Sequence, residues 1–484
     1  MENLKYRAIQ SGLARLCGQA VTLLLTLANV TIMARLLDPK DYGIVSMATA
    51  VTGLYSIFAF TGLSTVTIQR DTITDQQTSM LFWMNMAIGV LFALLCLATA
   101  PILVLFYHEP RLFWVTMVLA AGFVFNSLGI QHSALLQRRL RFVVLTTIET
   151  SSRVISMAIG ISMALAGFGY WALVTTNIVT PAIVAVLVWL TTAWVPGPPS
   201  RNVGARSMLR FGGTVTLNSL VSYLTYNFSM ILLGRVWGAE VLGVFSRSYW
   251  LMNFPTETLN AALGGVTFSA LSRLQCDPVR LRNYFLKGYS LVNSLTLPTT
   301  IFCALFSHDI ILVVLGSKWL DAEPIFRLLT PTVLIFGIIN PLGWLQQSIG
   351  LQERSLKMAL VIAPIVISAY LIGLPFGPKG VALSFSTAMT LWLFPHIIWS
   401  IRGTVFSLLD ILSAMGRPFL SAILAGATAF GAQRYIGELH SPFLRLGLEG
   451  ATMVLLYLFT LLFVMRQKSL YLDLLKSLAG PKPS

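Results

Sequence analysis

Charge is what this chain of 484 residues has least of. Only 11% of the residues are Asp, Glu, Lys or Arg, whereas 56% are hydrophobic and the mean hydropathy is +0.77. An ordinary soluble domain carries about 25% charged residues, so this composition excludes that class. We therefore predict an all-α polytopic membrane protein.

Several motifs are also missing, and each absence excludes a chemistry. The chain has no G-x-x-x-x-G-K-[ST] sequence, which argues against ATP hydrolysis. Its five His and four Cys residues make no metal-ligand or C-x-x-C spacing, so we expect no metal, no cofactor and no disulfide. A membrane glycosyltransferase, polymerase or ligase would need a large loop with catalytic groups. The longest outer connection, 307–323, is too short for a domain, so we do not expect an enzyme.

The basic excess is explained by topology. Lys and Arg outnumber Asp and Glu by 33 to 18, but the basic residues are dispersed between apolar segments rather than gathered in one patch. We therefore expect no nucleic-acid partner. With the N-terminus inside, most of the Lys and Arg residues fall in cytoplasmic connections, as the positive-inside rule requires. Both termini are accordingly predicted to be cytoplasmic.

Runs long enough to cross a bilayer, roughly 20 mostly apolar residues each, recur along the whole chain. The first run is expected to be an uncleaved helix rather than a signal peptide. We predict about 14 transmembrane helices, at 12–34, 42–67, 80–105, 112–131, 143–166, 169–193, 211–234, 243–271, 285–306, 324–349, 356–375, 379–400, 417–436 and 446–465.

The second half of the stretch Arg15 to Ser46 is echoed two hundred residues later. When the sequence is aligned with itself at an offset of 200 residues, Arg35, Gly43 and Ser46 align with Arg235, Gly243 and Ser246. In addition, Gln131–Arg138 resembles Gln346–Glu353. Segments 1–6 and 7–12 are therefore predicted to be two parallel six-helix copies, with the substrate path between the halves. The expected domains are 1–200, 201–405, and two extra helices with a basic cytoplasmic tail in 406–484.

Polar side chains line one face of the first helix. Arg15, Gln19, Thr22, Thr26 and Asn29 recur at steps of three and four residues, and the second copy keeps a similar stripe at Ser219, Ser222, Tyr226 and Ser229. Because lipid cannot face such a stripe, both stripes are expected to look into protein or into a wet interior.

Three basic residues, Arg15, Arg153 and Arg247, fall within apolar segments. Glu149 lies one turn before Arg153, so one interpretation is that the two side chains form an internal ion pair. Glu257 lies about 15 Å from Arg247 along the same helix. Arg15 and Arg247 have no acid within one turn, which favours a water-filled cavity for them.

Several short blocks together resemble a known family. They are Ala34–Gly43, Gly62–Leu63 with Ile68–Arg70, Leu136–Arg138 with Phe142, and Gly316–Trp319. These blocks look like those of the Wzx-type polysaccharide flippases, most closely the colanic-acid and amylovoran exporter branch. That family lies in the MOP superfamily, which also holds the MATE drug exporters and the lipid II flippase.

The resemblance implies a V-shaped pair of six-helix bundles in the bacterial inner membrane. It implies a flippase that turns undecaprenyl-pyrophosphate-linked oligosaccharide from the cytoplasmic to the periplasmic leaflet by alternating access, for exopolysaccharide or lipopolysaccharide synthesis. Implied partners are membrane lipids, a polymerase and other polysaccharide-assembly proteins. In relatives, cavity arginines on helices 1, 2, 7 and 8 engage the lipid head. Arg15 and Arg247 match these by helix and depth, and Arg35 and Arg235 lie at the outer ends of helices 1 and 7.

Residue chemistry supplies the candidate site. Guanidinium groups bind pyrophosphate as bidentate, permanently charged donors, so the pyrophosphate ligands expected are Arg15, Arg247, Arg153, Arg35 and Arg235. Helix-end arginines commonly snorkel to the interface, which is the alternative for Arg35 and Arg235. The expected glycan ligands are Gln19, Thr22, Thr26, Asn29, Tyr223, Tyr226 and Asn227, and Glu149 or Glu257 could carry a coupling ion. The rival functions are a lipid II-type flippase and a MATE-like exporter of small molecules.

Overall fold

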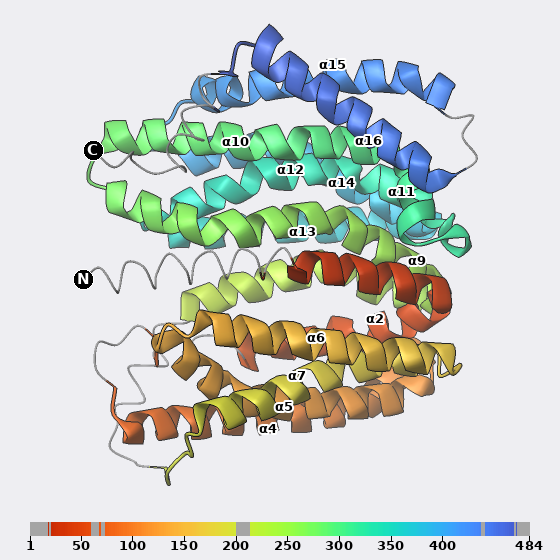
Figure 1. Cartoon of the computed structure of the whole chain (residues 1–484), viewed down its shortest axis with the longest axis vertical. Helices are drawn as coiled ribbons and strands as arrows, with labels where there is room; N and C mark the ends of the chain where they lie inside the picture. The colour runs from red at the N-terminus through yellow and green to blue at the C-terminus, as the bar shows by residue number, and fades with distance from the viewer. Residues whose placement is uncertain are drawn as a thin grey trace. The chain divides into compact units, whose positions relative to one another are not determined.

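The computed structural model describes residues 21–59, 73–199, 213–436 and 441–468, together with the single positions 18, 67, 68 and 471. Within these residues the chain is helical and contains no strand (Figure 1). The longer helices are Val21–Leu36, α2 (Pro39–Ala59), α4 (Asp75–Tyr107), α5 (Arg111–Arg138), α6 (Phe142–Leu165), α7 (Tyr170–Thr192), α9 (Gly213–Leu274), α10 (Pro278–Leu305), α12 (Ala322–Ser348), α13 (Gln352–Gly373), α14 (Gly377–Ile401), α15 (Leu408–Ile436) and α16 (Pro442–Phe459).

The expected fourteen helices are confirmed, because each apolar run coincides with a helix over its described residues. α9 covers two of the runs, since Gly238 interrupts it with a φ of 82° and a ψ of −178°. Only glycine adopts such a backbone conformation readily, and the chain therefore passes from one helix to the next without a long loop. Nine stretches within the described ranges are long and apolar enough to cross a membrane, and two of them, Leu217–Gly265 and Gln352–Ile401, each hold two helices. The protein is a multi-pass membrane protein.

The chain divides into two compact units, Met1–Ser246 and Arg247–Ser484. In the N-terminal unit α5 packs against both α4 and α7, and α6 packs against α7 (Figure 1). Small residues bring these helices close together, since a Cβ on Gly89 would lie 1.9 Å from the Ser127 Oγ and one on Gly129 would lie 3.3 Å from the Ala185 Cα. Close packing of this kind stabilises helices in lipid, where no hydrophobic driving force acts between them.

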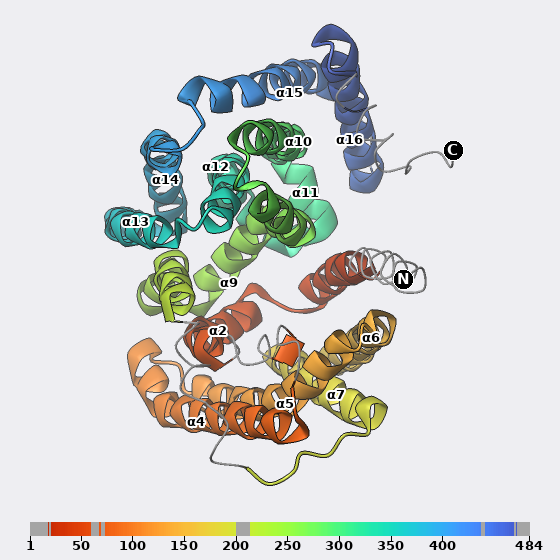
Figure 2. The same ribbon diagram turned by 90° about the vertical axis from the view of Figure 1, so that its left-hand side faces the viewer.

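In the C-terminal unit α12 packs against α10 and α14, and α13 lies beside α14 (Figure 2). The two extra helices belong to this unit, because α15 packs on α10 and α16 packs on α15 and on the short helix α11 (Ser307–Val314). Two ion pairs hold them there, one between Arg282 and Asp410 and one between Arg445 and the buried Asp309.

A contact between α2 and the second part of α9, inside the N-terminal unit, supports the predicted repeat. A Cβ on Gly43 would lie 1.7 Å from the carbonyl oxygen of Ala239, and a Cβ on Gly243 would lie 1.7 Å from that of Pro39. The Ser46 hydroxyl donates to the Ser246 hydroxyl at 3.1 Å, across the same offset of 200 residues. Reciprocal contacts between equivalent residues are the mark of a two-fold relation.

We expect Gly43→Ala to destabilise the protein, because its methyl group would collide with the Ala239 backbone. Overpacking of this kind costs about 1–3 kcal/mol, which should appear as a lower midpoint of thermal unfolding in detergent. Gly122→Ala in α5 is the control, since a Cβ there meets nothing within 4 Å. Equal midpoints for the two variants would contradict the proposed backbone contact.

Candidate functional site

A cavity of about 600 Å³ lies inside the N-terminal unit, among the helix Val21–Leu36 and α5, α6 and α7. Ten of its seventeen lining residues have polar side chains. Those side chains are Thr26, Asn29, Asn126, Ser133, Glu149, Arg153, Ser156, Thr176, Asn177 and Thr180.

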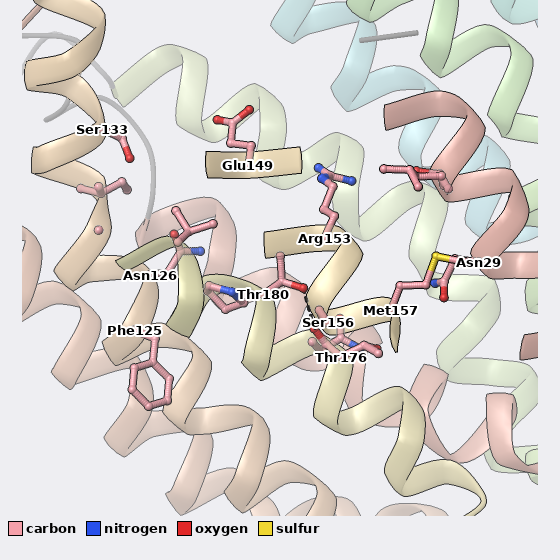
Figure 3. A pocket seen from close by; sticks show the side chains of 17 residues that line it. Asn29, Phe125, Asn126, Ser133, Glu149, Arg153, Ser156, Met157, Thr176 and Thr180 are labelled. Atoms are coloured by element: carbon pink, nitrogen blue, oxygen red, sulfur yellow. Dashed lines mark hydrogen bonds between the residues drawn. The ribbon is translucent and has the colours of Figure 1, made fainter. Parts of the chain in front are cut away.

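The charged residues of the cavity come from one face of α6. Glu149, Arg153 and Ser156 follow one another at steps of four and three residues, so a regular helix presents them on the same side. Figure 3 shows the side chains of Glu149 and Arg153 extending to the same side of α6. The spacing that suggested an internal pair therefore also places both groups on the cavity wall.

The contact of α6 with α7 shapes the part of the cavity wall around Ser156 and Thr176. The Ser156 hydroxyl donates to the Thr176 carbonyl at 3.1 Å, and a Cβ on Gly160 would lie only 2.4 Å from the Thr176 Cγ2 atom. Glycine at 160 lets the two helices approach, and this approach brings the polar residues of α7 to the cavity.

The amide of Asn29 offers an acceptor to a ligand. Its Oδ1 atom is buried and has no hydrogen-bond partner among the described residues. The hydroxyls of Thr26 and Thr180, in contrast, donate to the carbonyls four residues earlier, at 2.7 and 2.9 Å. An unsatisfied buried acceptor costs about 1–3 kcal/mol, which a sugar hydroxyl or a water would relieve.

A second cavity of about 220 Å³ adjoins the first, because Asn126, Asn177 and Pro181 line both. Thr49, Thr52 and Ser56 of α2 contribute its remaining polar side chains. The polar interior of the N-terminal unit thus extends from α6 to α2.

Four of the residues predicted for the site line the main cavity, namely Thr26, Asn29, Glu149 and Arg153. Tyr223 and Asn227 line neither of the two cavities. The Tyr223 hydroxyl donates to the Ala50 carbonyl at 3.0 Å, and the Asn227 amide donates to the Tyr223 carbonyl at 3.0 Å. The first bond joins α9 to α2 and the second lies within α9. The role of both residues as glycan ligands stays a prediction.

The remaining predicted residues lie elsewhere. Thr22 and Tyr226 are partly buried outside both cavities, and Arg35 and Glu257 are exposed. The Arg235 guanidinium lies 5.8 Å from the centre of the Phe106 ring, and that of Arg247, in the C-terminal unit, lies 5.9 Å from the centre of the Trp250 ring. Arg15 and Gln19 lie outside the described residues.

Sequence analysis missed the polar residues of α5 and α7. Asn126 and Ser133 lie seven residues apart in α5, and Thr176 and Thr180 lie four apart in α7. This is the periodicity by which the first helix was recognised, so the same test on every apolar segment finds these residues.

The side chains of the cavity are of the types that suit an anionic group and hydroxyls. Arg153 supplies a permanently charged donor for phosphate, while the amides and hydroxyls suit a sugar. Within the described residues, no group of His, Cys, Asp and Glu side chains is arranged to hold a metal ion.

Comparison with known proteins shows to which family the chain belongs. A family model described as "Polysaccharide biosynthesis protein" matches residues 32–324, more than half of the sequence. The chain belongs to this polysaccharide biosynthesis protein family.

Two curated members of the family and one solved structure illustrate the relation. The chain is 26% identical to the lipopolysaccharide biosynthesis protein WzxC of Escherichia coli over 75% of this chain and 74% of that protein. It is 30% identical to the teichuronic acid biosynthesis protein TuaB of Bacillus subtilis over 58% and 59%. The structure titled "Lipid II flippase MurJ, inward closed conformation" shares the fold, with a TM-score of 0.75 at 14% identity over 95% of this chain and 99% of that one.

We expect the main cavity to be accessible to water, and a matched pair of residues on α6 tests this. Met157 lines the cavity, whereas Ile155 is 44% exposed on the outside of the same helix. In a background in which Ser replaces all four cysteines, Met157→Cys should react with a charged, water-soluble thiol reagent. Ile155→Cys should not react, because lipid surrounds its side chain. Equal labelling of the two variants would show that the cavity is not hydrated.

Proposed function

We propose that this protein is a flippase for an undecaprenyl-pyrophosphate-linked oligosaccharide in the bacterial inner membrane. It acts by alternating access in the assembly of a cell-surface polysaccharide, and it is a transporter rather than an enzyme. The observation that carries the proposal is the cavity of the N-terminal unit, where Arg153 lies among amides and hydroxyls within an apolar helical bundle.

The chemistry of the cavity matches the head of such a lipid. A pyrophosphate crossing a low-dielectric layer needs cationic donors, and Arg153 provides one that cannot lose its charge. Asn29, Asn126 and Asn177 each combine a donor and an acceptor, which is what sugar hydroxyls require. Glu149 lies on the same wall, and in this proposal it carries the coupling proton or cation.

The proposed orientation has both termini in the cytoplasm, as the distribution of Lys and Arg favours. The family membership supports a role in polysaccharide synthesis, and the relatives' names place WzxC and TuaB in lipopolysaccharide and teichuronic acid biosynthesis. A polymerase or another assembly protein would receive the flipped lipid.

Two rival functions differ in their cargo. A MATE-like exporter of cationic drugs would bind its cargo with acids, and Glu149 is the one observation that favours it. Arg153 beside Glu149 leaves this cavity without a net negative charge, which favours the anionic lipid. A lipid II flippase would use similar phosphate ligands but a different glycan.

Complementation separates these functions. We expect the protein to restore polymer export in bacteria that lack a Wzx-type flippase, because the cavity accepts a pyrophosphate-linked glycan. It should restore neither growth after depletion of the lipid II flippase nor drug resistance after loss of a MATE exporter. Rescue of one of these latter strains, without rescue of polymer export, would reject the proposal.

Removing a cationic side chain should lower export. Arg15→Ala, Arg153→Ala and Arg247→Ala should each reduce polymer export, and loss of one charged hydrogen bond should weaken binding of undecaprenyl pyrophosphate roughly tenfold to hundredfold. Lys at the same positions should rescue partly, because it keeps the charge but loses the bidentate geometry.

The control for these variants is Arg139→Ala, since Arg139 directly follows α5 and lines neither cavity of the N-terminal unit. Membrane levels are compared by immunoblot and export by polymer at the cell surface. Wild-type export in all three Ala variants would reject the assigned phosphate ligands.

A further inference from the structure

A long apolar groove in the C-terminal unit lies apart from the polar cavity. It has a volume of about 1260 Å³ and runs along α13 and α14, with one residue of α12 in its wall. This volume exceeds the roughly 300–1,000 Å³ of an ordinary small-molecule pocket. Its exposed lining residues include Ile372, Phe376, Leu383 and Leu391.

Three polar side chains of the groove wall have donors that are satisfied within α14. The hydroxyl of Ser384 donates to the Val381 carbonyl at 3.2 Å, and that of Thr387 donates to the Leu383 carbonyl at 2.8 Å. The Trp392 indole donates to the His396 Nδ1 atom at 3.2 Å. A hydrocarbon ligand therefore leaves none of these donors unpaired.

The groove has one charged end. Lys379, an exposed residue in the first turn of α14, lines it there, and Pro395 lines the other end. The backbones of α13 and α14 are in contact at the charged end. A Cβ on Gly373 would lie 2.5 Å from the carbonyl oxygen of Gly380, and a Cβ on Gly380 would lie 2.4 Å from the carbonyl oxygen of Gly373. This contact closes the space between the backbones, so a ligand lies along the groove rather than between the helices.

The length of the groove can be compared with the length of the hydrocarbon chains of different lipids. Lys379 and Pro395 are sixteen residues apart, about 24 Å along a helix. Half of a hydrocarbon core of about 30 Å is about 15 Å, so an acyl chain confined to one leaflet covers only part of the groove. A polyprenyl chain is long enough to follow the groove across the bilayer centre.

We propose that this groove binds the polyprenyl chain of the lipid-linked cargo, with a phosphate of its head beside Lys379. The inference rests on the proposed function and adds to it a second site, for the tail. In the proposed orientation Lys379 lies at the outer end, so the groove holds the lipid after its head has reached the outer leaflet.

Photo-crosslinking tests the groove with the full chain in nanodiscs. The probe is undecaprenyl phosphate with a photoreactive group within its isoprenoid chain, and mass spectrometry maps the labelled peptides. We expect labelling of α13 and α14 that excess undecaprenyl phosphate prevents and excess phosphatidylglycerol does not. Labelling confined to other helices, or equal competition by phosphatidylglycerol, would overturn the proposal, the latter identifying the groove as an ordinary phospholipid site.

Two variants locate the ligand within the groove. Ile372→Trp should reduce labelling several-fold by filling the groove, whereas Leu371→Trp, the control at the adjacent exposed position outside it, should not. Lys379→Gln leaves the apolar wall intact and should weaken probe binding about fivefold. Unchanged labelling and binding in both groove variants would refute the assignment.

Export assays separate this inference from the proposed function. If wild-type protein restores polymer export but the groove is not labelled, the tail site is wrong and the function stands. If the groove is labelled but export is not restored, the proposed function is wrong and the groove remains a polyprenyl site.

Discussion

The cost of exposing a polar side chain to lipid is the constraint on which this structure depends. A charged group at the centre of a bilayer costs at least about 2.5 kcal/mol, so Glu149 and Arg153 cannot face hydrocarbon without compensation. They lie instead on the wall of a cavity with eight uncharged polar residues. Both side chains are exposed, and the polar lining of the cavity rather than burial provides their surroundings.

Glycine lets the helices around the cavity approach one another closely. Gly160 lets α6 approach Thr176 of α7, and Gly129 lets α5 approach Ala185, so the helices enclose the cavity without bulky side chains between them. Gly43 and Gly243 serve the contact between α2 and α9 in the same way. In lipid, close approach of backbones supplies dispersion and hydrogen bonding in place of the hydrophobic effect.

The two units carry surfaces of opposite chemistry, and a lipid-linked oligosaccharide needs both. The N-terminal cavity presents an arginine, amides and hydroxyls, whereas the C-terminal groove presents hydrocarbon and ends at one lysine. Such a lipid contains groups of both chemistries, a glycan with pyrophosphate and an isoprenoid.

Sequence alone determined the class and the fourteen helices, because hydropathy and helical period are local properties that lipid enforces on every segment, whereas the division into two six-helix copies stays a prediction. It also determined that Glu149 and Arg153 share a face, since a spacing of four residues implies this in any helix. Only the tertiary structure decided which polar faces meet. Asn126 and Asn177 are 51 positions apart yet line one cavity, whereas Tyr223, a plausible sugar ligand by type, donates to the backbone of α2. Such pairings depend on how whole helices pack, and that packing is set by many weak contacts between distant residues rather than by any local pattern.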